Sequence, residues 1–185
     1  IYDGEKHISI ASLPGMKERT FTMNGFSKAY SMTGWRIGYV AAPKEYIAVL
    51  NKIHQHNTTC APSFVQKAAI AAFREETDEV ENMVREYEER RNCAVKAINS
   101  IPGLSCLTPK GAFYIFINIK ALGHSSAWMA EYLLNEAKVA LVPGDVFGPG
   151  GEGYLRLSFA ASMDVVREGC LRIAEAVKKL QEGEA

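Results

Sequence analysis

The sequence has no excess of charge of either sign and no long apolar run. Its 185 residues carry 21 Lys and Arg against 21 Asp and Glu, so the formal net charge at pH 7 is zero. Binding to a phosphate backbone requires a basic surplus, so this balance argues against a nucleic-acid partner. No segment approaches the ~20 consecutive apolar residues of a membrane-spanning helix. With 48% hydrophobic residues, the chain is also too apolar for a disordered protein.

Cysteine motifs and metal-ligand clusters are missing as well. The four cysteines are widely scattered and form no C-x-x-C motif: Cys60, Cys93, Cys106 and Cys170. This pattern favours free thiols in a cytoplasmic protein. His54 and His56 are the only close histidine pair, and imidazoles two residues apart share a face only on a strand. No cysteine or acidic residue stands near them at ligand spacing, so we expect no metal site.

The sequence also lacks an initiator Met, a basic leader and the apolar core of a signal peptide. It opens with Ile1-Tyr2-Asp3, which favours a chain cut at its N-terminus. The length is nevertheless ample for one hydrophobic core. We therefore expect part of a larger protein.

Apolar periodicity predicts alternating strands and helices. Strands are expected at 19–26, 37–42, 112–117, 139–142 and 154–159. Helices are expected at 44–54, 64–73, 78–99, 126–137 and in a C-terminal stretch from about 166 to 180. We interpret the dense charges of 78–99 as a solvated helix face. Strands interleaved with helices, without repeats, indicate an α/β fold.

One glycine-rich stretch matches a nucleotide-binding motif by its letters only. Gly148-Pro-Gly150-Gly-Glu-Gly153 fits G-x-G-x-x-G. A dinucleotide site needs this turn to open a helix, whose free N–H groups meet the pyrophosphate. Here the glycines lead into the strand predicted at 154–159. We interpret the stretch as a flexible loop.

The segment from Asn24 to Tyr39 holds candidate chemistry. Lys28 stands on a polar loop between two predicted strands, with Ser27 immediately before it and Arg36 eight residues later. A lysine in a semi-buried cleft can present the neutral amine that a Schiff base requires. A hydroxyl and a guanidinium nearby can hold a phosphate, the guanidinium through paired N–H donors.

This string closely resembles the pyridoxal-phosphate lysine region of class I/II (fold-type I), aspartate aminotransferase-like enzymes. Their pattern is S-K-x-x-x-x-T-G-W-R-x-G-Y, and every fixed position is met. Other segments resemble the same family: Tyr2 to Ser9, Lys110 to Tyr114, and Val142 to Phe159. The last resembles the family's C-terminal motif, in which Arg156 takes the place of the substrate-binding arginine.

The spacing around Arg156 agrees with that role. On a strand of period two, Leu155 and Leu157 face one side and Arg156 faces the other. The leucines can then join a core while the arginine meets an anion. A planar, permanently charged guanidinium suits a carboxylate better than an ammonium does.

The resemblance implies a cofactor and a role for each candidate residue. Lys28 would hold pyridoxal 5'-phosphate as a Schiff base and move a proton at the substrate Cα as general acid–base. Ser27 and Arg36 would anchor the cofactor's phosphate, and Arg156 would bind the substrate's α-carboxylate. The family's aspartate and tyrosine that contact the cofactor ring are expected before the first residue. Tyr2 is not that tyrosine, because the residues around it match a tyrosine that comes several residues later in the family pattern.

We therefore expect the C-terminal part of an aminotransferase that transfers an amino group between an amino acid and a 2-oxo acid. Residues 1–43 would end the large domain, 44–100 would form connecting helices, and 101–185 a small α/β domain. The resemblance implies a cytoplasmic homodimer when full-length, and an inactive chain in isolation. The alternatives are a lyase or decarboxylase with the same fold and cofactor, and the aminotransferase-like effector domain of a transcriptional regulator.

Overall fold

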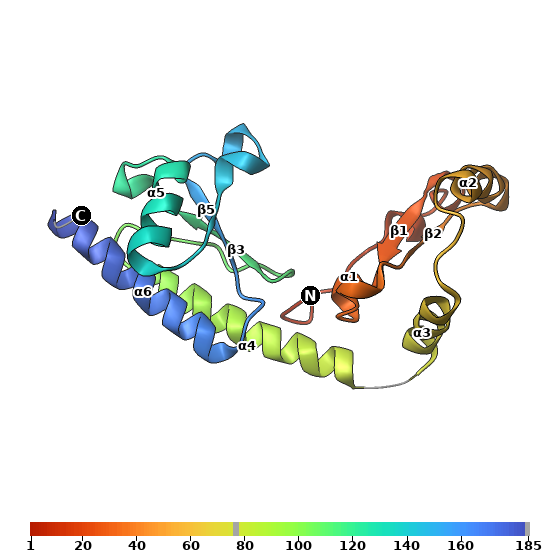
Figure 1. Cartoon of the computed structure of the whole chain (residues 1–185), viewed down its shortest axis with the longest axis horizontal. Helices are drawn as coiled ribbons and strands as arrows, with labels where there is room; N and C mark the ends of the chain where they lie inside the picture. Colours follow the sequence, from red (N-terminus) through yellow and green to blue (C-terminus); the bar gives the residue numbers. More distant parts are fainter. Residues whose placement is uncertain (76–77, 184–185) are drawn as a thin grey trace. The chain divides into compact units, whose positions relative to one another are not determined.

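The computed structural model describes residues 1–75 and 78–183. The chain divides into two units (Figure 1): Lys6–Asn82 forms one, and Ile1–Glu5 joins the chain from Met83 onward in the other. Within the described residues, no helix is both long and apolar enough to cross a membrane.

A two-stranded antiparallel sheet organises the Lys6–Asn82 unit. β1 (Thr22–Gly25) pairs with β2 (Gly38–Ala41), so that Gly25 lies opposite Gly38. Gly38 has no room for a side chain, because a Cβ there would lie 2.8 Å from the Asn24 carbonyl oxygen. The segment between the strands holds the short helix α1 (Phe26–Ala29) and a 3-10 turn at Thr33–Trp35.

Two longer helices follow the sheet in this unit. α2 (Lys44–Asn57) and α3 (Ser63–Arg74) each begin directly after a proline, Pro43 and Pro62. A proline suits this entry position because its missing N–H is not needed there.

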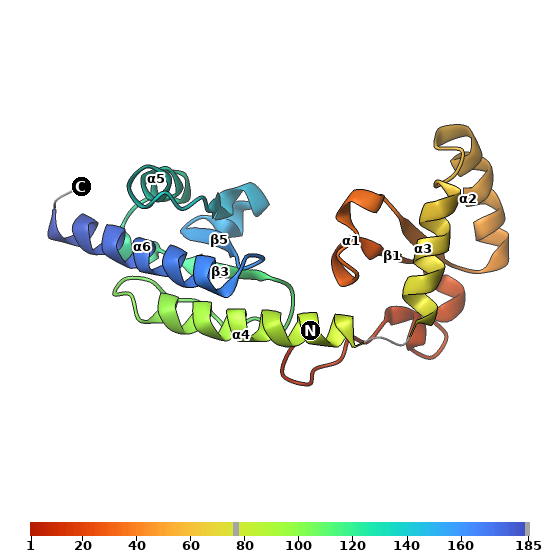
Figure 2. The same cartoon turned by 60° about the horizontal axis from the view of Figure 1, so that its bottom comes forward.

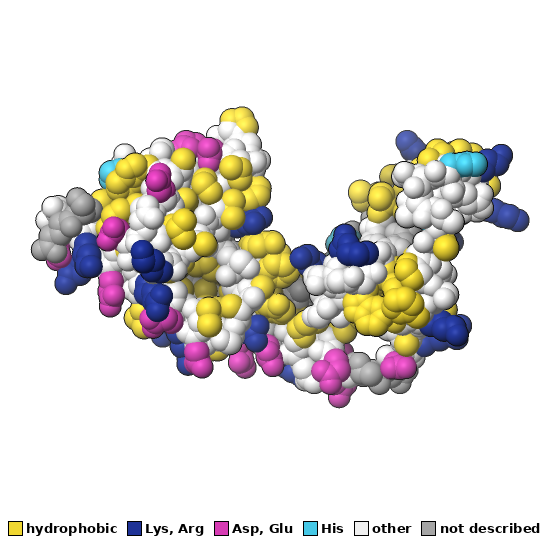
Figure 3. All heavy atoms as spheres, in the orientation of Figure 1, with side chains coloured by type: hydrophobic (Ala, Val, Ile, Leu, Met, Phe, Trp, Pro, Cys, Tyr) yellow, Lys and Arg dark blue, Asp and Glu magenta, His cyan; other side chains and the backbone are white. Residues whose placement is uncertain are grey.

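The Lys6–Asn82 unit buries little of its apolar surface. Its buried hydrophobic side chains among the described residues are Phe26, Val65 and Ala69. Large apolar side chains are exposed over its surface, as the yellow atoms of Figure 3 illustrate, with Met23 76% and Phe64 66% exposed. Apolar surface of this extent is typical of a face that other polypeptide covers.

The second unit contains a three-stranded antiparallel sheet in the order β3-β5-β4. Its strands are β3 (Tyr114–Asn118), β4 (Val142–Pro143) and β5 (Tyr154–Ser158). Its helices are α4 (Glu79–Asn99), which begins in the first unit, α5 (Ser126–Tyr132) and α6 (Met163–Glu182). α4 and α6 lie side by side in both ribbon views (Figure 1, Figure 2). The mixed helix and sheet content confirms the predicted α/β class.

One face of this sheet forms the core, and the other does not. On β5, Leu155 is 0% and Leu157 is 6% exposed, whereas Arg156 between them is half-buried. β3 alternates in the same way, with Ile115 and Ile117 buried. The buried face packs with side chains of all three helices, among them Ile98, Met129 and Ile173. This confirms the prediction that Arg156 lies on the face of the sheet opposite to the two leucines.

Local chemistry explains where α5 and α6 begin and where α6 ends. The Ser125 hydroxyl accepts a hydrogen bond from the Trp128 N–H at 3.3 Å, and Ser162 accepts one from Val165 at 3.4 Å. Both serines therefore satisfy N–H groups that a helix leaves unpaired at its start. α6 ends at Gly183, whose left-handed φ of 77° suits a residue without a side chain.

The structure differs from the sequence prediction at a loop, at a strand and in the exposure of one helix. The stretch expected to be a polar loop from Ser27 to Thr33 begins inside α1, because Ser-Lys-Ala tolerates a helical turn once Phe26 is anchored in the core. β4 spans Val142–Pro143 and not the predicted 139–142, because the Val139 N–H still donates to the Leu133 carbonyl of the preceding helical turn. Arg91 is only 2% exposed, so the charges of α4 are not all on a solvated face.

Candidate functional site

Backbone hydrogen bonds close the loop that carries Lys28. The Phe26 N–H donates to the Ile37 carbonyl at 3.3 Å, and the Phe26 carbonyl accepts from Met32 N–H at 3.3 Å. The first bond ties the residues just before Ser27 and Lys28 to those just after Arg36. All three predicted residues therefore lie at the base of one closed loop.

The loop is anchored by aromatic packing. The Phe26 ring is 2% exposed and contacts Phe73 edge-on, with ring centroids 4.9 Å apart. It also lies 5.3 Å from Tyr30 and 6.0 Å from Tyr39. This small cluster fixes the start of α1, on which Ser27 is half-buried and Lys28 is exposed.

Arg36 adopts an uncommon backbone conformation. Its φ of 51° and ψ of 48° are left-handed, which few residues other than glycine adopt. Its Nη1 donates to the Thr33 carbonyl at 2.9 Å, so the side chain folds back over its own turn. This geometry leaves further guanidinium N–H groups for an anion.

Arg156 lies in the other unit, on the open face of the sheet. Its Cζ is 4.4 Å from the centroid of the Tyr114 ring and 4.6 Å from that of Phe147. Within residues 1–75 and 78–183, its guanidinium makes no hydrogen bond and no ion pair with the protein. A half-buried cation in this state is suited to an anion supplied from outside.

A cavity of about 850 Å³ opens beside Arg156. Its walls include the rings of Tyr114, Phe116 and Tyr154, and the loop from Ser105 to Pro109 closes one side. Phe116 and Tyr154 stack with centroids 5.0 Å apart and an interplanar angle of 7°. The cavity therefore joins one cation to flat apolar walls, a combination that binds small organic anions.

Cys106 also lines this cavity but offers no reactive thiolate. Burial raises the pKa of its thiol above the ordinary value of 9.0, so the thiol stays protonated at neutral pH. Nucleophilic catalysis by this cysteine is therefore disfavoured.

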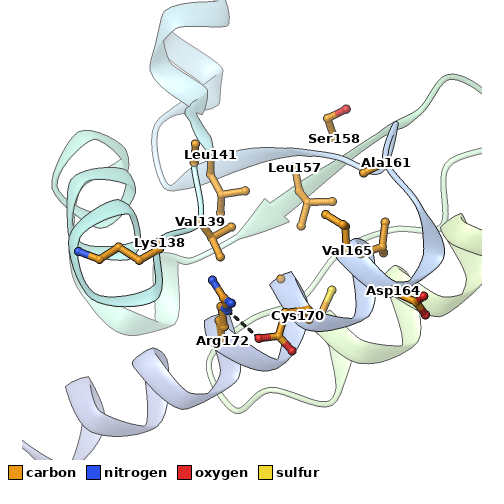
Figure 4. A pocket seen from close by; sticks show the side chains of 14 residues that line it. Lys138, Val139, Leu141, Leu157, Ser158, Ala161, Asp164, Val165, Cys170 and Arg172 are labelled. Atoms are coloured by element: carbon orange, nitrogen blue, oxygen red, sulfur yellow. Dashed lines mark hydrogen bonds and ion pairs between the residues drawn. The ribbon is translucent and has the colours of Figure 1, made fainter.

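A second cavity, of about 600 Å³, lies between α6, β5 and the segment 138–141 that leads into β4 (Figure 4). Leu141, Leu157 and Val165 form its apolar wall, and the Arg172–Glu168 ion pair, at 2.8 Å, stands at its rim. None of the candidate site residues Ser27, Lys28, Arg36 and Arg156 lines it. The cavity beside Arg156 is therefore the better candidate site.

The histidine pair lies on a helix rather than a strand. His54 and His56 both belong to α2, and side chains two apart on a helix point to different sides. In the part of the chain that the structure describes, no group of three or more His, Cys, Asp or Glu side chains is placed to hold a metal ion.

Sequence reasoning missed the aromatic neighbours of Arg156. Tyr114 and Phe147 both stand in segments that matched the family pattern, but no role was assigned to them. Their contact with Arg156 depends on the register that places Phe116 opposite Arg156 and on the turn after β4. The strand pattern of 112–117 was the available signal, because Tyr114 and Phe116 share one face.

The chain matches a family model described as aminotransferase class I and II over residues 2–173. It is 48% identical over 181 residues to an aromatic-amino-acid aminotransferase of Thermococcus litoralis, covering 97% of this chain and 46% of that protein. It is equally 48% identical over 181 residues to an aspartate aminotransferase of Pyrococcus abyssi, with the same coverage.

A solved structure shows the same relationship. The aromatic aminotransferase from Pyrococcus horikoshii OT3 superposes with a TM-score of 0.94 at 46% identity, covering 98% of this chain and 48% of that one. The chain thus spans about half the length of the curated relatives it matches.

Proposed function

Because this chain belongs to the class I and II aminotransferase family, we propose that it forms part of a pyridoxal-phosphate-dependent aminotransferase. The reaction would move an amino group between an amino acid and a 2-oxo acid. Arg156 would bind the α-carboxylate that both substrates share, and Lys28 would be the catalytic residue.

The environment of Arg156 is the observation that carries this proposal. The guanidinium is half-buried beside a cavity and has no acidic partner among the described residues. A structural arginine at this depth would normally be paired, because an uncompensated buried charge is costly. A carboxylate ligand supplies the missing charge, and the planar fork can bind both of its oxygens.

The residues of the Lys28 loop fit the cofactor's chemistry. The loop offers the amine of Lys28, the hydroxyl of Ser27 and the guanidinium of Arg36. The amine can hold the cofactor's aldehyde covalently, and the other two groups can hold its phosphate. When bound, the cofactor supplies an electron sink that stabilises negative charge at the substrate Cα. The Lys28 amine would move the proton at that carbon.

The exposed apolar surface of the Lys6–Asn82 unit supports a longer protein. We propose that residues 1–43 complete a large domain, 44–100 connect it, and 101–185 form the small domain, with the first five residues packed on the C-terminal unit. The remainder of the large domain would cover side chains such as Met23 and Phe64, which are 76% and 66% exposed. We further propose a cytoplasmic homodimer as the working form.

The proposal is tested by trapping the cofactor. The full-length protein is loaded with pyridoxal phosphate and reduced with borohydride, and the modified peptide is located by mass spectrometry. We expect the label on Lys28, and none on any lysine in Lys28→Ala. Lys52→Ala, which removes an exposed lysine from α2, is the matched control and should keep the label on Lys28.

Activity is then measured with a panel of amino donors and 2-oxoglutarate. We expect turnover in the full-length protein, loss in Lys28→Ala and no turnover in the isolated 185-residue chain. Unchanged transamination in Lys28→Ala would overturn the assignment. Amine release without an oxo acid would show a decarboxylase instead.

A further inference from the structure

We propose that Phe147 and Tyr114 are positioning residues that hold the Arg156 guanidinium ready for a carboxylate. This inference rests on the proposed function, in which Arg156 binds the substrate. It adds two residues that act through Arg156 and do not themselves bind the carboxylate.

The rings of Tyr114 and Phe147 both contact the charged Arg156 guanidinium and leave its N–H donors available. The Arg156 Cζ lies 4.4 Å from the Tyr114 centroid and 4.6 Å from the Phe147 centroid, within the range of a cation–π interaction. Such an interaction uses the positive charge and needs no N–H group. The five N–H donors of the guanidinium therefore remain for an incoming anion.

The backbone fixes the position of Phe147. Its 3-10 turn, Gly144–Phe147, ends with the Gly148 N–H donating to the Asp145 carbonyl at 3.0 Å. Gly144 and Gly151 approach so closely that a Cβ on either would overlap the other's carbonyl oxygen. The ring also meets Phe116 at a near right angle, with centroids 6.2 Å apart.

Tyr114 is held by the sheet itself. It lies on β3 two residues before Phe116, and Phe116 is the direct cross-strand partner of Arg156. Residues at that diagonal spacing lie on the same face and within reach of a long side chain. The Tyr114 ring is therefore fixed independently of the turn that carries Phe147.

The benefit of this arrangement is preorganisation. An arginine side chain has many rotamers, and fixing one of them on binding opposes affinity. Because the rings restrict the guanidinium before the ligand arrives, less freedom is lost on binding. Phe147 is 52% exposed, so its contribution to the core is small and a substitution there mainly changes its effect on Arg156.

The test is a double-mutant cycle in the full-length protein loaded with pyridoxal phosphate. The dissociation constant for 2-oxoglutarate is measured by titration calorimetry for the parent, Phe147→Leu, Arg156→Gln and the double variant. We expect Phe147→Leu to weaken binding about three- to fivefold where Arg156 is present. In the Arg156→Gln background it should have no further effect, because the residue through which it acts is gone.

Two controls separate positioning from general damage. Phe147→Tyr keeps a ring and should bind like the parent, and Val146→Ala changes an exposed neighbour on the same turn and should do the same. In steady-state assays, Phe147→Leu should raise KM for 2-oxoglutarate and leave kcat unchanged. If Phe147→Leu does not fold by circular dichroism, the same cycle is run with Tyr114→Leu, with Tyr114→Phe as its control.

The outcomes distinguish this inference from the proposed function. An equal loss from the leucine variant in both Arg156 backgrounds, or no loss in either, overturns the positioning role. An unchanged dissociation constant in Arg156→Gln overturns the carboxylate site itself.

Discussion

The guanidinium of Arg91 holds both carboxylate oxygens of Asp3, which lies 88 residues earlier in the chain. Its Nη1 donates to one oxygen at 2.6 Å and its Nη2 to the other at 2.8 Å. Nη1 also donates to the Pro109 carbonyl at 2.9 Å. One buried side chain on α4 thus joins the N-terminal segment to the loop that leads into β3.

The neighbouring residues reinforce this connection. The Tyr2 ring lies 4.8 Å from the Arg91 Cζ, and its hydroxyl donates to the Ala112 carbonyl. The Tyr2 N–H donates to the Lys110 carbonyl at 2.9 Å. Segment 1–5 therefore packs as an integral part of the C-terminal unit.

The first prediction concerns stability. Arg91→Met should lower the free energy of unfolding by about 2 kcal/mol, because several charge-assisted hydrogen bonds of a buried side chain are lost together. The adjacent Arg90 pairs with Glu86 at 2.7 Å on the helix surface. Arg90→Met should cost about 0.5 kcal/mol or less. Urea denaturation of this chain, followed by circular dichroism, measures both, and equal losses would contradict the role given to Arg91.

The second prediction follows from the pKa of Asp3. Hydrogen bonds from Arg91 lower the pKa of this carboxyl below its ordinary value of 3.8. A lowered folded-state pKa stabilises the fold above the unfolded-state value, and the contribution is lost as pH falls through the folded-state value. The stability difference between the parent and Asp3→Asn should therefore be constant near neutral pH and shrink below about 3.8.

Urea midpoints of the two proteins over a pH series measure this difference. Comparing the variants cancels the titration of carboxyl groups that both retain. A difference that stayed the same from neutral pH into the acid range would show that Asp3 ionisation does not contribute.

Local patterns in the sequence predicted what is local in the fold. The period-two alternation of β5 predicted that Arg156 faces away from the side of the sheet that Leu155 and Leu157 share, and the burial of the two leucines confirms it. The 3.6-residue stripe of α4 also contained a further signal. Arg91 stands between Tyr87 and Ala94 at the spacing of the apolar stripe, so its burial could have been inferred from its position.

Contacts between distant segments could not be predicted in this way. Nothing local links Asp3 to Arg91, or the turn carrying Phe147 to Arg156, because these contacts depend on sheet register and helix packing. The helical turn of α1 likewise depends on Phe26, whose ring is anchored by aromatic rings from β2 and α3. Tertiary packing decided each of these features.

The third prediction concerns the cysteines. Burial raises the pKa of the Cys170 thiol to about 11, and the side chain is 3% exposed. Because the thiolate is the reactive form, Cys170 in the native chain should react with iodoacetamide about a hundred times more slowly than an ordinary thiol. Cys60 is exposed and should react first.

Mass spectrometry of peptides from a labelling time course gives the rate at each cysteine. Labelling in urea is the control, because unfolding should make all four rates similar. A native-state rate at Cys170 that equals the rate at Cys60 would contradict the burial on which the prediction rests.

The last prediction tests the turn that carries Phe147. A Cβ on Gly151 would overlap the Gly144 carbonyl, so Gly151→Ala must push apart the two ends of the loop. Overpacking of this kind costs about 1–3 kcal/mol, and we expect that loss in the free energy of unfolding. At Gly150 a Cβ would meet nothing within 4 Å, so Gly150→Ala should change stability by less than about 0.5 kcal/mol. Hydrogen exchange should accelerate at Gly148, whose N–H closes the turn onto Asp145, in the first variant only. Equal behaviour of the two alanine variants would mean that the close approach of Gly144 and Gly151 does not hold the turn in place.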